Sequence, residues 1–426
     1  MEMNDSKRGQ GRRFAARAWT LVVGAGLAVS SAAASSVDVL CIYYPEWHVY
    51  PEGDVIFGKG RTEWDFVNTA KPQFEGHEQP IVLRDGNPND ADPTDVAKEI
   101  DYAASAGIDV FVYDWYWAKG KPIQHEALEQ GFLAASNRGK MKFALMWANH
   151  NRSDVFRSAP GHAGDRYFWM LDYTRDEFLS ALDYCIAHYF GRPEYYRKDG
   201  RLFFSVYSVK PLMAGVGGPA ALKAVLAEVQ ARARQAGLPP IHFSAMVRSV
   251  KDQPDVCAAG FDSMSAYNVT PYDFDDANVG RTNGEKRQIF AHEEYAAAHA
   301  SFNARLAKGA LPYIPVVCRG WDCTPRCRQD EPFPYRTLSY PYLGVISGMK
   351  PEVFGAMVAT ARKQAADDPK RPGAILLNAW NEYTEGSYLM PDTRHGDAFL
   401  KAMKKAVAPD GTGTREWCAK QAWLNL

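Results

Sequence analysis

The chain has 426 residues, enough for one large domain or two of ordinary size. Its formal net charge of −1 provides no global attraction to nucleic acid or to an anionic membrane, so neither is expected as a partner. The aromatic side chains (11 Trp, 22 Tyr and 21 Phe) often stand beside Asp, Glu, Asn or His. This mixture suits the C–H faces and hydroxyl rim of a sugar, although an aromatic core explains the composition equally well.

A secretory signal peptide is predicted at residues 1–34. Arginines precede the apolar stretch 18–30, which is too short to span a bilayer comfortably. Ala32 and Ala34 then follow in the small-residue arrangement that signal peptidases require. We therefore expect a secreted or periplasmic protein in which residues 35–426 form a single domain.

Short apolar runs rich in β-branched and aromatic residues alternate with amphipathic patterns along the rest of the chain. The expected strands are 37–44, 107–115, 142–149, 201–208, 241–247, 261–268, 313–321 and 373–381. Expected helices include 92–107, with Asp92 or Thr94 as its N-cap, and 175–190, 219–237 and 293–309. Several strands are apolar at successive positions, as in strands buried on both faces. Eight strands alternating with helices predict the α/β fold of a (β/α)8 TIM barrel.

An open doubly wound sheet is the alternative fold. It would carry a glycine-rich phosphate turn after its first strand, whereas this sequence continues with "YYPEWHVYP" and contains no G-x-G-x-x-G motif or P-loop. The barrel is therefore favoured. The segment 45–92 is too long for a simple connection, and long loops inside compact domains are usually functional. We expect this loop, after the first strand, to cover the C-terminal face of the barrel.

Three of the seven cysteines, Cys318, Cys323 and Cys327, form a C-x4-C-x3-C cluster. A structural zinc would need a fourth ligand at a comparable spacing, and none is evident in the sequence. In an exported protein, a disulfide within this loop is the favoured interpretation, with the pairing left open.

Polar and aromatic residues gather where the predicted strands end. In a (β/α)8 barrel the active site is built from the C-terminal ends of the strands and the loops that follow them. The candidate substrate-binding residues are Tyr43, Tyr44, Glu63, His77, Asp114, Trp115, Trp117, Trp147, Asn149, His150, Tyr267, Arg319, Trp380, Asn381 and Tyr383. Any one of them could be a structural group, but their shared place at one end of the barrel predicts a sugar site.

Glu382 and Glu385 are the candidate catalytic residues, because they follow the last predicted strand. On a helical turn this spacing brings the Cβ atoms to about 5–6 Å. Two carboxylates that close titrate apart, one with a raised pKa and one with a low pKa, which suits acid–base cleavage of a glycosidic bond. An isolated E-x-x-E pair is usually a solvated helix face. Here Trp380, Tyr383 and Tyr388 surround the pair and favour catalysis.

Two stretches carry a family resemblance. "GKGRTEWDFVNTAKPQFEGHEQP" (58–80) and "NAWNEYTEGSYLMPD" (378–392) resemble motifs of the glycoside hydrolase family 99-like proteins, including the WbsX group. The resemblance covers nearly the whole mature chain. It implies a (β/α)8 barrel that cleaves α-mannosidic linkages within glycan chains, with retention and without a metal or cofactor. It also implies that Glu382 acts as a base on the substrate's own 2-hydroxyl, and that Glu385 is the general acid and then the base.

Two positions depart from the pattern of that group. Met390 stands where many relatives carry a carboxylate, and His150 follows "WAN" where the group usually has Glu, which puts mannose as the sugar in doubt. Some WbsX-type proteins are labelled glycosyltransferases, but an exported chain would meet no nucleotide-sugar donor. A catalytically silent glycan-binding barrel is the other alternative, and it would have no use for the paired carboxylates. The sequence thus predicts a hydrolase of a polysaccharide or glycan.

Overall fold

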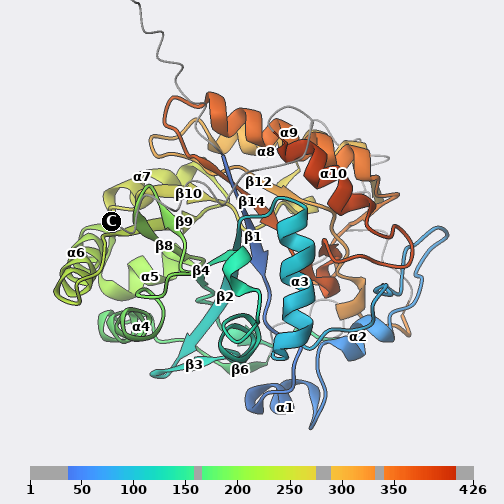
Figure 1. The fold of residues 1–426 in the computed structure, drawn as a ribbon, viewed down its shortest axis with the longest axis horizontal. Helices are drawn as coiled ribbons and strands as arrows, with labels where there is room; N and C mark the ends of the chain where they lie inside the picture. The colour runs from blue at the N-terminus through green and yellow to red at the C-terminus, as the bar shows by residue number, and fades with distance from the viewer. Residues whose placement is uncertain (1–36, 158–165, 275–288, 332–339, 409–426) are drawn as a thin grey trace, which may run out of the picture. The chain divides into compact units, whose positions relative to one another are not determined.

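A parallel sheet curled into a barrel forms the centre of the computed structural model, which describes residues 37–157, 166–274, 289–331 and 340–408 (Figure 1). The barrel strands are β1 (Asp38–Tyr43), β2 (Val110–Ala118), β4 (Lys142–Trp147), β8 (Arg201–Val206), β9 (Ile241–Met246), β10 (Ser263–Ser265), β12 (Val316–Cys318) and β14 (Ala374–Asn378). They are hydrogen-bonded in the order β10-β9-β8-β4-β2-β1-β14-β12, all in parallel. The predicted signal peptide lies outside the described residues and stays a prediction.

The ring closes just before β12. The Met264 amide donates to the Pro312 carbonyl at 2.9 Å, and the Ile314 amide donates to the Met264 carbonyl at 2.7 Å. These bonds join β10 to the segment that leads into β12. The predicted (β/α)8 barrel is therefore confirmed.

Helices follow most strands and cover the barrel from outside. The α-helices are α1 (Pro51–Phe57), α2 (Trp64–Asn68), α3 (Pro93–Ser105), α4 (Arg175–His188), α5 (Val209–Val216), α6 (Pro219–Gln235), α7 (Gln253–Ala258), α8 (His292–Leu306), α9 (Pro351–Asp367) and α10 (Ala398–Val407). Asp92 caps α3, because its side chain accepts from the Thr94 amide at 2.7 Å. No single described helix is long and apolar enough to cross a membrane; α5 and α6 together pass that test but are bent by 93° at their junction.

Short strands and helical turns lie within the loops. The short strands are β3 (Lys121–Ile123), β5 (Arg152–Ser153), β6 (Tyr167–Trp169), β7 (Arg197–Lys198), β11 (Ile289–Ala291), β13 (Val345–Ser347), β15 (Asn381–Glu382) and β16 (Ser387–Tyr388). A π-helix, η1 (Ala127–Phe132), follows β2, and the 3-10 turns are η2 (Arg138–Lys140), η3 (Val250–Asp252), η4 (Pro271–Asp273), η5 (Thr324–Arg326) and η6 (Tyr383–Glu385).

Alternate residues of each strand face opposite sides of the barrel wall. Leu40, Ile42, Val110 and Val112 belong to the cluster inside the barrel. Their neighbours in the chain belong to the larger cluster between the strands and the helices, which includes Val39, Cys41, Tyr43, Phe111, Tyr113, Trp115 and Trp117. The same alternation decides which residues in the C-terminal half of β2 reach the barrel mouth.

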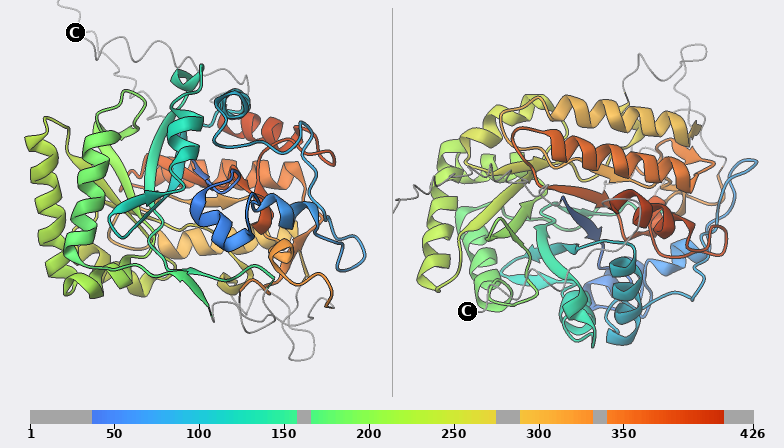
Figure 2. Two further views of the ribbon diagram at one scale, coloured as in Figure 1. Left: turned by 90° about the horizontal axis from the view of Figure 1, so that it is seen from below. Right: turned by 45° about the horizontal axis from the view of Figure 1, so that its top comes forward.

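The loop after β1 lies on the segments that follow β12 and β14, as Figure 2 shows for the blue α1–α2 region beside the orange and red chain. Trp64 of α2 stacks on Tyr383 with ring centroids 4.8 Å apart. The Lys71 amide donates to the side chain of Gln329 at 2.8 Å. These segments leave the C-terminal ends of their strands, so the loop covers that face of the barrel, as predicted.

The predicted disulfide is wrong, because each described cysteine is a free thiol. Cys318 ends β12, where its sulfur accepts from the Val269 amide at 3.4 Å. Cys323 and Cys327 flank η5, and the Cys327 thiol faces the carbonyl oxygens of Cys323 and Pro341 at 3.6 and 3.7 Å. Each sulfur therefore has its own surroundings. Across the described ranges, no group of three or more His, Cys, Asp or Glu side chains is arranged to hold a metal ion.

Candidate active site

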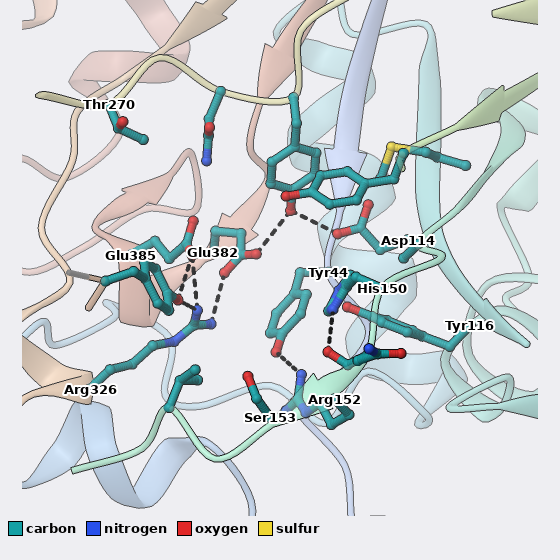
Figure 3. A pocket seen from close by; sticks show the side chains of 18 of the residues that line it. Tyr44, Asp114, Tyr116, His150, Arg152, Ser153, Thr270, Arg326, Glu382 and Glu385 are labelled. Carbon is teal, nitrogen blue, oxygen red and sulfur yellow. Dashed lines mark hydrogen bonds and ion pairs between the residues drawn. The ribbon is translucent and has the colours of Figure 1, made fainter. Parts of the chain in front are cut away.

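A cavity of about 440 Å³ lies at the C-terminal ends of the barrel strands (Figure 3). Its lining comes from the ends of β1, β2, β4, β8, β9, β10, β12 and β14 or from the loops that follow them. The lining residues include Tyr44, Asp114, Tyr116, Met146, His150, Arg152, Tyr207, Arg248, Tyr267, Asn268, Thr270, Trp321, Arg326, Tyr340, Glu382 and Glu385. Segments far apart in the sequence thus meet here because parallel strands all end at the same face.

Glu382 and Glu385 both face this cavity. Glu382 stands at the N-terminal end of η6 and Glu385 at its other end, so one short turn carries both. Arg326, from η5, joins them: its Nη1 donates to Glu385 Oε1 at 2.9 Å, and its Nη2 lies 3.4 Å from Glu382 Oε2. Burial and the repulsion of Glu385 raise the pKa of Glu382 well above its ordinary value, against the attraction of Arg326.

A third carboxylate reaches the same guanidinium from the loop after β1. Glu63 is fully buried, and its Oε1 accepts from Arg326 Nη2 at 3.0 Å. Burial raises the pKa of Glu63 to about 7, although Arg326 opposes that shift. One arginine therefore serves three carboxyl groups, an arrangement that favours keeping a proton among them at neutral pH.

A second buried ion pair forms a neighbouring part of the wall, since Arg152 and Arg326 both pack on the ring of Phe156. Arg152 Nη2 lies 2.5 and 2.6 Å from the two carboxylate oxygens of Glu46. The hydroxyls of Tyr44 and Tyr50 also donate to Glu46. Because Glu46 neutralises Arg152, this wall offers the side chain of Arg152 and the ring of Tyr44 to a ligand, with little net charge.

Six of the predicted residues line the cavity, namely Tyr44, Asp114, His150, Tyr267, Glu382 and Glu385. Glu63 lies behind Arg326. His150 Nδ1 is 3.1 Å from the Asn151 carbonyl, and burial lowers its pKa to about 4. A neutral ring that donates through Nδ1 keeps Nε2 as a hydrogen-bond acceptor.

Most of the other predicted aromatic residues belong to the packing outside the barrel wall. Trp115 and Trp117 stack on each other at 5.6 Å and pack against Tyr184 of α4, whereas the alternate residues Asp114 and Tyr116 line the cavity. The remaining contacts in this layer are Tyr43 on Tyr113 (4.5 Å), Trp147 on Phe178 (5.5 Å) and the Trp380 indole donating to Glu99 (3.0 Å). Tyr383 lies on Trp64 under the loop after β1. The two-residue period of a strand separates these rings from the cavity.

The other predicted polar residues hold neighbouring loops in place. The side chain of Asn381 binds the backbone of Tyr44, because it accepts from the Tyr44 amide at 2.7 Å and donates to the Tyr44 carbonyl at 2.9 Å. Asn149 bonds both backbone groups of Ser208 in the same manner. Arg319 donates to Asp392 at 3.1 Å beneath Tyr388. His77 is 2.9 Å from Asp322 and lines a separate cavity of about 260 Å³.

Arg326 is the main residue of this cavity that the sequence did not reveal. The stretch "CRGWDCTPRC" contains two arginines, and Arg319 was selected from it because it directly follows the strand. The signal that was present is electrostatic, since two neighbouring buried carboxylates require a nearby cation. Nothing in the local pattern indicates which arginine meets that need. Arg152, in the two-residue strand β5, and Tyr340 were likewise missed, because the segments that carry them show no periodic pattern.

Fold and cavity together define a (β/α)8 barrel with carboxyl groups at the strand ends. The GH99 endo-alpha-mannosidase of Bacteroides thetaiotaomicron has the same fold, with a TM-score of 0.55 and 16% identity over 87% of this chain and 97% of that one. A glycoside hydrolase-like protein gives a TM-score of 0.54 and 14% identity over 88% and 94%. At such identities the likeness concerns the fold alone.

The family is shown by a sequence model. The model for glycosyltransferase WbsX matches residues 39–403, and the chain belongs to this family. The protein WxcX of Xanthomonas campestris pv. campestris strain B100 is 29% identical over 395 residues, and that of strain ATCC 33913 is 28% identical over 394. These matches cover 91% of this chain but 52% of each relative, so the chain spans about half their length. The predicted resemblance to family 99-like and WbsX-like proteins is confirmed.

Proposed function

We propose that this protein is an exported glycoside hydrolase that cleaves internal, α-linked bonds of a polysaccharide or glycan with retention. The observation that carries the proposal is the pair Glu382 and Glu385, which face one cavity at the barrel mouth and share the guanidinium of Arg326. Retaining hydrolysis needs one group that removes a proton and one that supplies a proton to the leaving oxygen.

The hydrogen bonds favour one assignment of the two roles. Both oxygens of Glu382 have donors nearby, the Tyr267 hydroxyl at 3.0 Å and Arg326 at 3.4 Å, which stabilises a carboxylate suited to act as a base. In Glu385, Oε1 accepts from Arg326 and from Tyr340, both at 2.9 Å, whereas Oε2 has no hydrogen-bond partner among the described residues. An unengaged oxygen is what a proton donor to a substrate requires.

The proposed reaction has two steps. Glu382 takes the proton of the substrate's 2-hydroxyl, the 2-oxygen bonds to the anomeric carbon, and the bond to the leaving oxygen breaks as Glu385 protonates that oxygen. Glu385 then takes a proton from water, whose oxygen attacks the anomeric carbon; the bond between that carbon and the 2-oxygen breaks, and Glu382 returns its proton to the 2-oxygen. Two inversions at the same carbon retain its configuration.

The test compares Glu382→Gln and Glu385→Gln on the natural glycan and on substrates with activated aryl or fluoride leaving groups. General acid–base assistance is worth about 10²–10⁴-fold in rate, so both variants should lose that much on the glycan. Glu385→Gln should retain more activity on the activated substrates, which leave without a proton. Glu75→Gln, an exposed position in the loop after β1, is the matched control. Near wild-type rates for both variants would overturn the proposal.

Transfer of a sugar is the second candidate, favoured by the description of the matching family model. Product analysis separates the two: a hydrolase releases reducing ends into water, whereas a transferase consumes a nucleotide-sugar or joins the glycan to an acceptor. Export is tested by the N-terminus of protein purified from its host, which should begin near Ser35. Abundant protein that still begins with Met1 would contradict export.

A further inference from the structure

The Tyr267 hydroxyl lies between two carboxyl groups that line the cavity. Its oxygen is 2.7 Å from Asp114 Oδ2 and 3.0 Å from Glu382 Oε1, the two contacts drawn between Asp114 and Glu382 in Figure 3. A phenol has a single hydrogen, so it donates to one carboxyl and must accept from the other. One of the two carboxyl groups therefore carries a proton.

The surroundings of the two groups differ. Glu382 has a second partner in Arg326, whose cation favours the ionised form. Asp114 is buried, and its Oδ1 has no hydrogen-bond partner within the described part of the chain. An ionised Asp114 would place part of its charge on a buried oxygen without a donor, which is costly. The proton therefore belongs on Asp114.

The other charged and titratable groups around the pair agree with this placement. Burial raises the pKa of Asp114, the hydrogen bond with Tyr267 opposes that shift, and Glu385 raises the pKa further. Glu382 also faces Glu63 and Glu385 as well as Arg326. The phenols of Tyr116 and Tyr207 adjoin both carboxyls; burial raises both of their pKa values, that of Tyr207 to about 12, so they remain neutral.

We propose that Asp114 is a neutral carboxylic acid that donates to Tyr267 and thereby orients the tyrosine to donate to Glu382. Asp114 is then a positioning residue. Its effect on catalysis rests on the proposed function, because it concerns Glu382 as the base. The hydrogen bond from Tyr267 stabilises the carboxylate of Glu382 against burial and against Glu385. The pair thus holds one structural proton, and the hydrogen bond from Tyr267 opposes the rise in the pKa of Glu382 that burial and Glu385 cause.

An infrared experiment tests the position of the proton without any substrate. Wild-type protein labelled with ¹³C-carboxyl aspartate should show a carboxylic-acid carbonyl band at neutral pH that moves with the label. The band should vanish in Asp114→Asn and persist in Glu382→Gln, which is the matched control. A wild-type spectrum without such a band, or a band that is lost in Glu382→Gln and kept in Asp114→Asn, would overturn the proposal.

The pH profile of kcat/KM on the glycan tests the consequence. Tyr267→Phe removes the donor to Glu382, so the acid limb should rise by about one to two pH units, the size expected for a hydrogen bond to a charged group. Asp114→Ala should move the limb in the same direction, and Asp114→Asn, whose amide can still donate to Tyr267, should restore it. If Asp114 were ionised, Asp114→Asn would remove a negative charge and lower the limb instead, which would refute the inference. If no hydrolysis is found at all, the proposed function fails, and the infrared result still decides where the proton lies.

Discussion

Glu63→Gln is the substitution whose effect on stability the structure defines best. Glu63 is fully buried under the loop after β1, with Oε1 3.0 Å from Arg326 and Oε2 without a partner among the described residues. Glutamine has nearly the same shape and still presents an oxygen to Arg326. The substitution therefore removes a titrating group and leaves the packing in place.

The magnitude follows from the pKa of Glu63, which burial raises from 4.5 to about 7. The folded protein holds this proton more tightly than the unfolded chain does, so the group contributes stability that is fully present below pH 4.5. That stability is lost as the pH rises towards 7. Each pH unit in this interval corresponds to about 1.4 kcal/mol, which makes a change of about 3 kcal/mol. Glu63→Gln should not show this loss.

The assay is urea unfolding followed by tryptophan fluorescence at pH 4.5 and at pH 8, for the wild type, Glu63→Gln and the exposed control Glu75→Gln. Between these two conditions the free energy of unfolding of Glu63→Gln should change by about 3 kcal/mol in its favour relative to the wild type. The control should follow the wild type, because Glu75 is exposed and lies outside the buried carboxylate network. Parallel pH dependence of wild type and Glu63→Gln would show that Glu63 is ionised normally and would refute the reasoning.

Three further predictions concern the site and its surroundings. Arg326→Met should destabilise the protein at neutral pH by about 3–5 kcal/mol in urea unfolding, because it leaves buried carboxylates without their cation; a smaller cost at acidic pH is expected, and equal costs would argue against the network. Trp147→Ala should cost about 3–5 kcal/mol of stability, since the ring packs on Phe178, and KM should not change. An increased KM would instead indicate that Trp147 contributes to substrate binding, as the sequence predicted. Exhaustive chelation should leave hydrolysis intact, and a loss that a divalent ion restores would contradict the expected metal-free chemistry.

Local patterns in the sequence were sufficient to predict the fold. Apolar runs of strand length, separated by helical periodicity, predicted all eight barrel strands, and the cap residue Asp92 marked where α3 begins. The length of segment 45–92 indicated the loop that covers the barrel mouth. Glu382 and Glu385 were found because they lie three residues apart directly after the last strand. Each of these features is contained in a short window of sequence, where propensity and spacing act.

The lining of the cavity was decided by tertiary structure. β2 is buried on both faces, so its sequence has no polar side to mark the interior, and the choice between Asp114 and its neighbour Trp115 depended on how the barrel closes. Contacts between distant residues were equally hidden: Arg326 reaches Glu382 across 56 positions, and Tyr267 reaches Asp114 across 153. Sequence alone therefore identified the carboxylates that perform the proposed chemistry. Only the folded structure showed that Arg326 and Tyr267 contact these carboxylates. Such electrostatic partners are close in space but far apart in the sequence, so no periodic pattern along the chain indicates them.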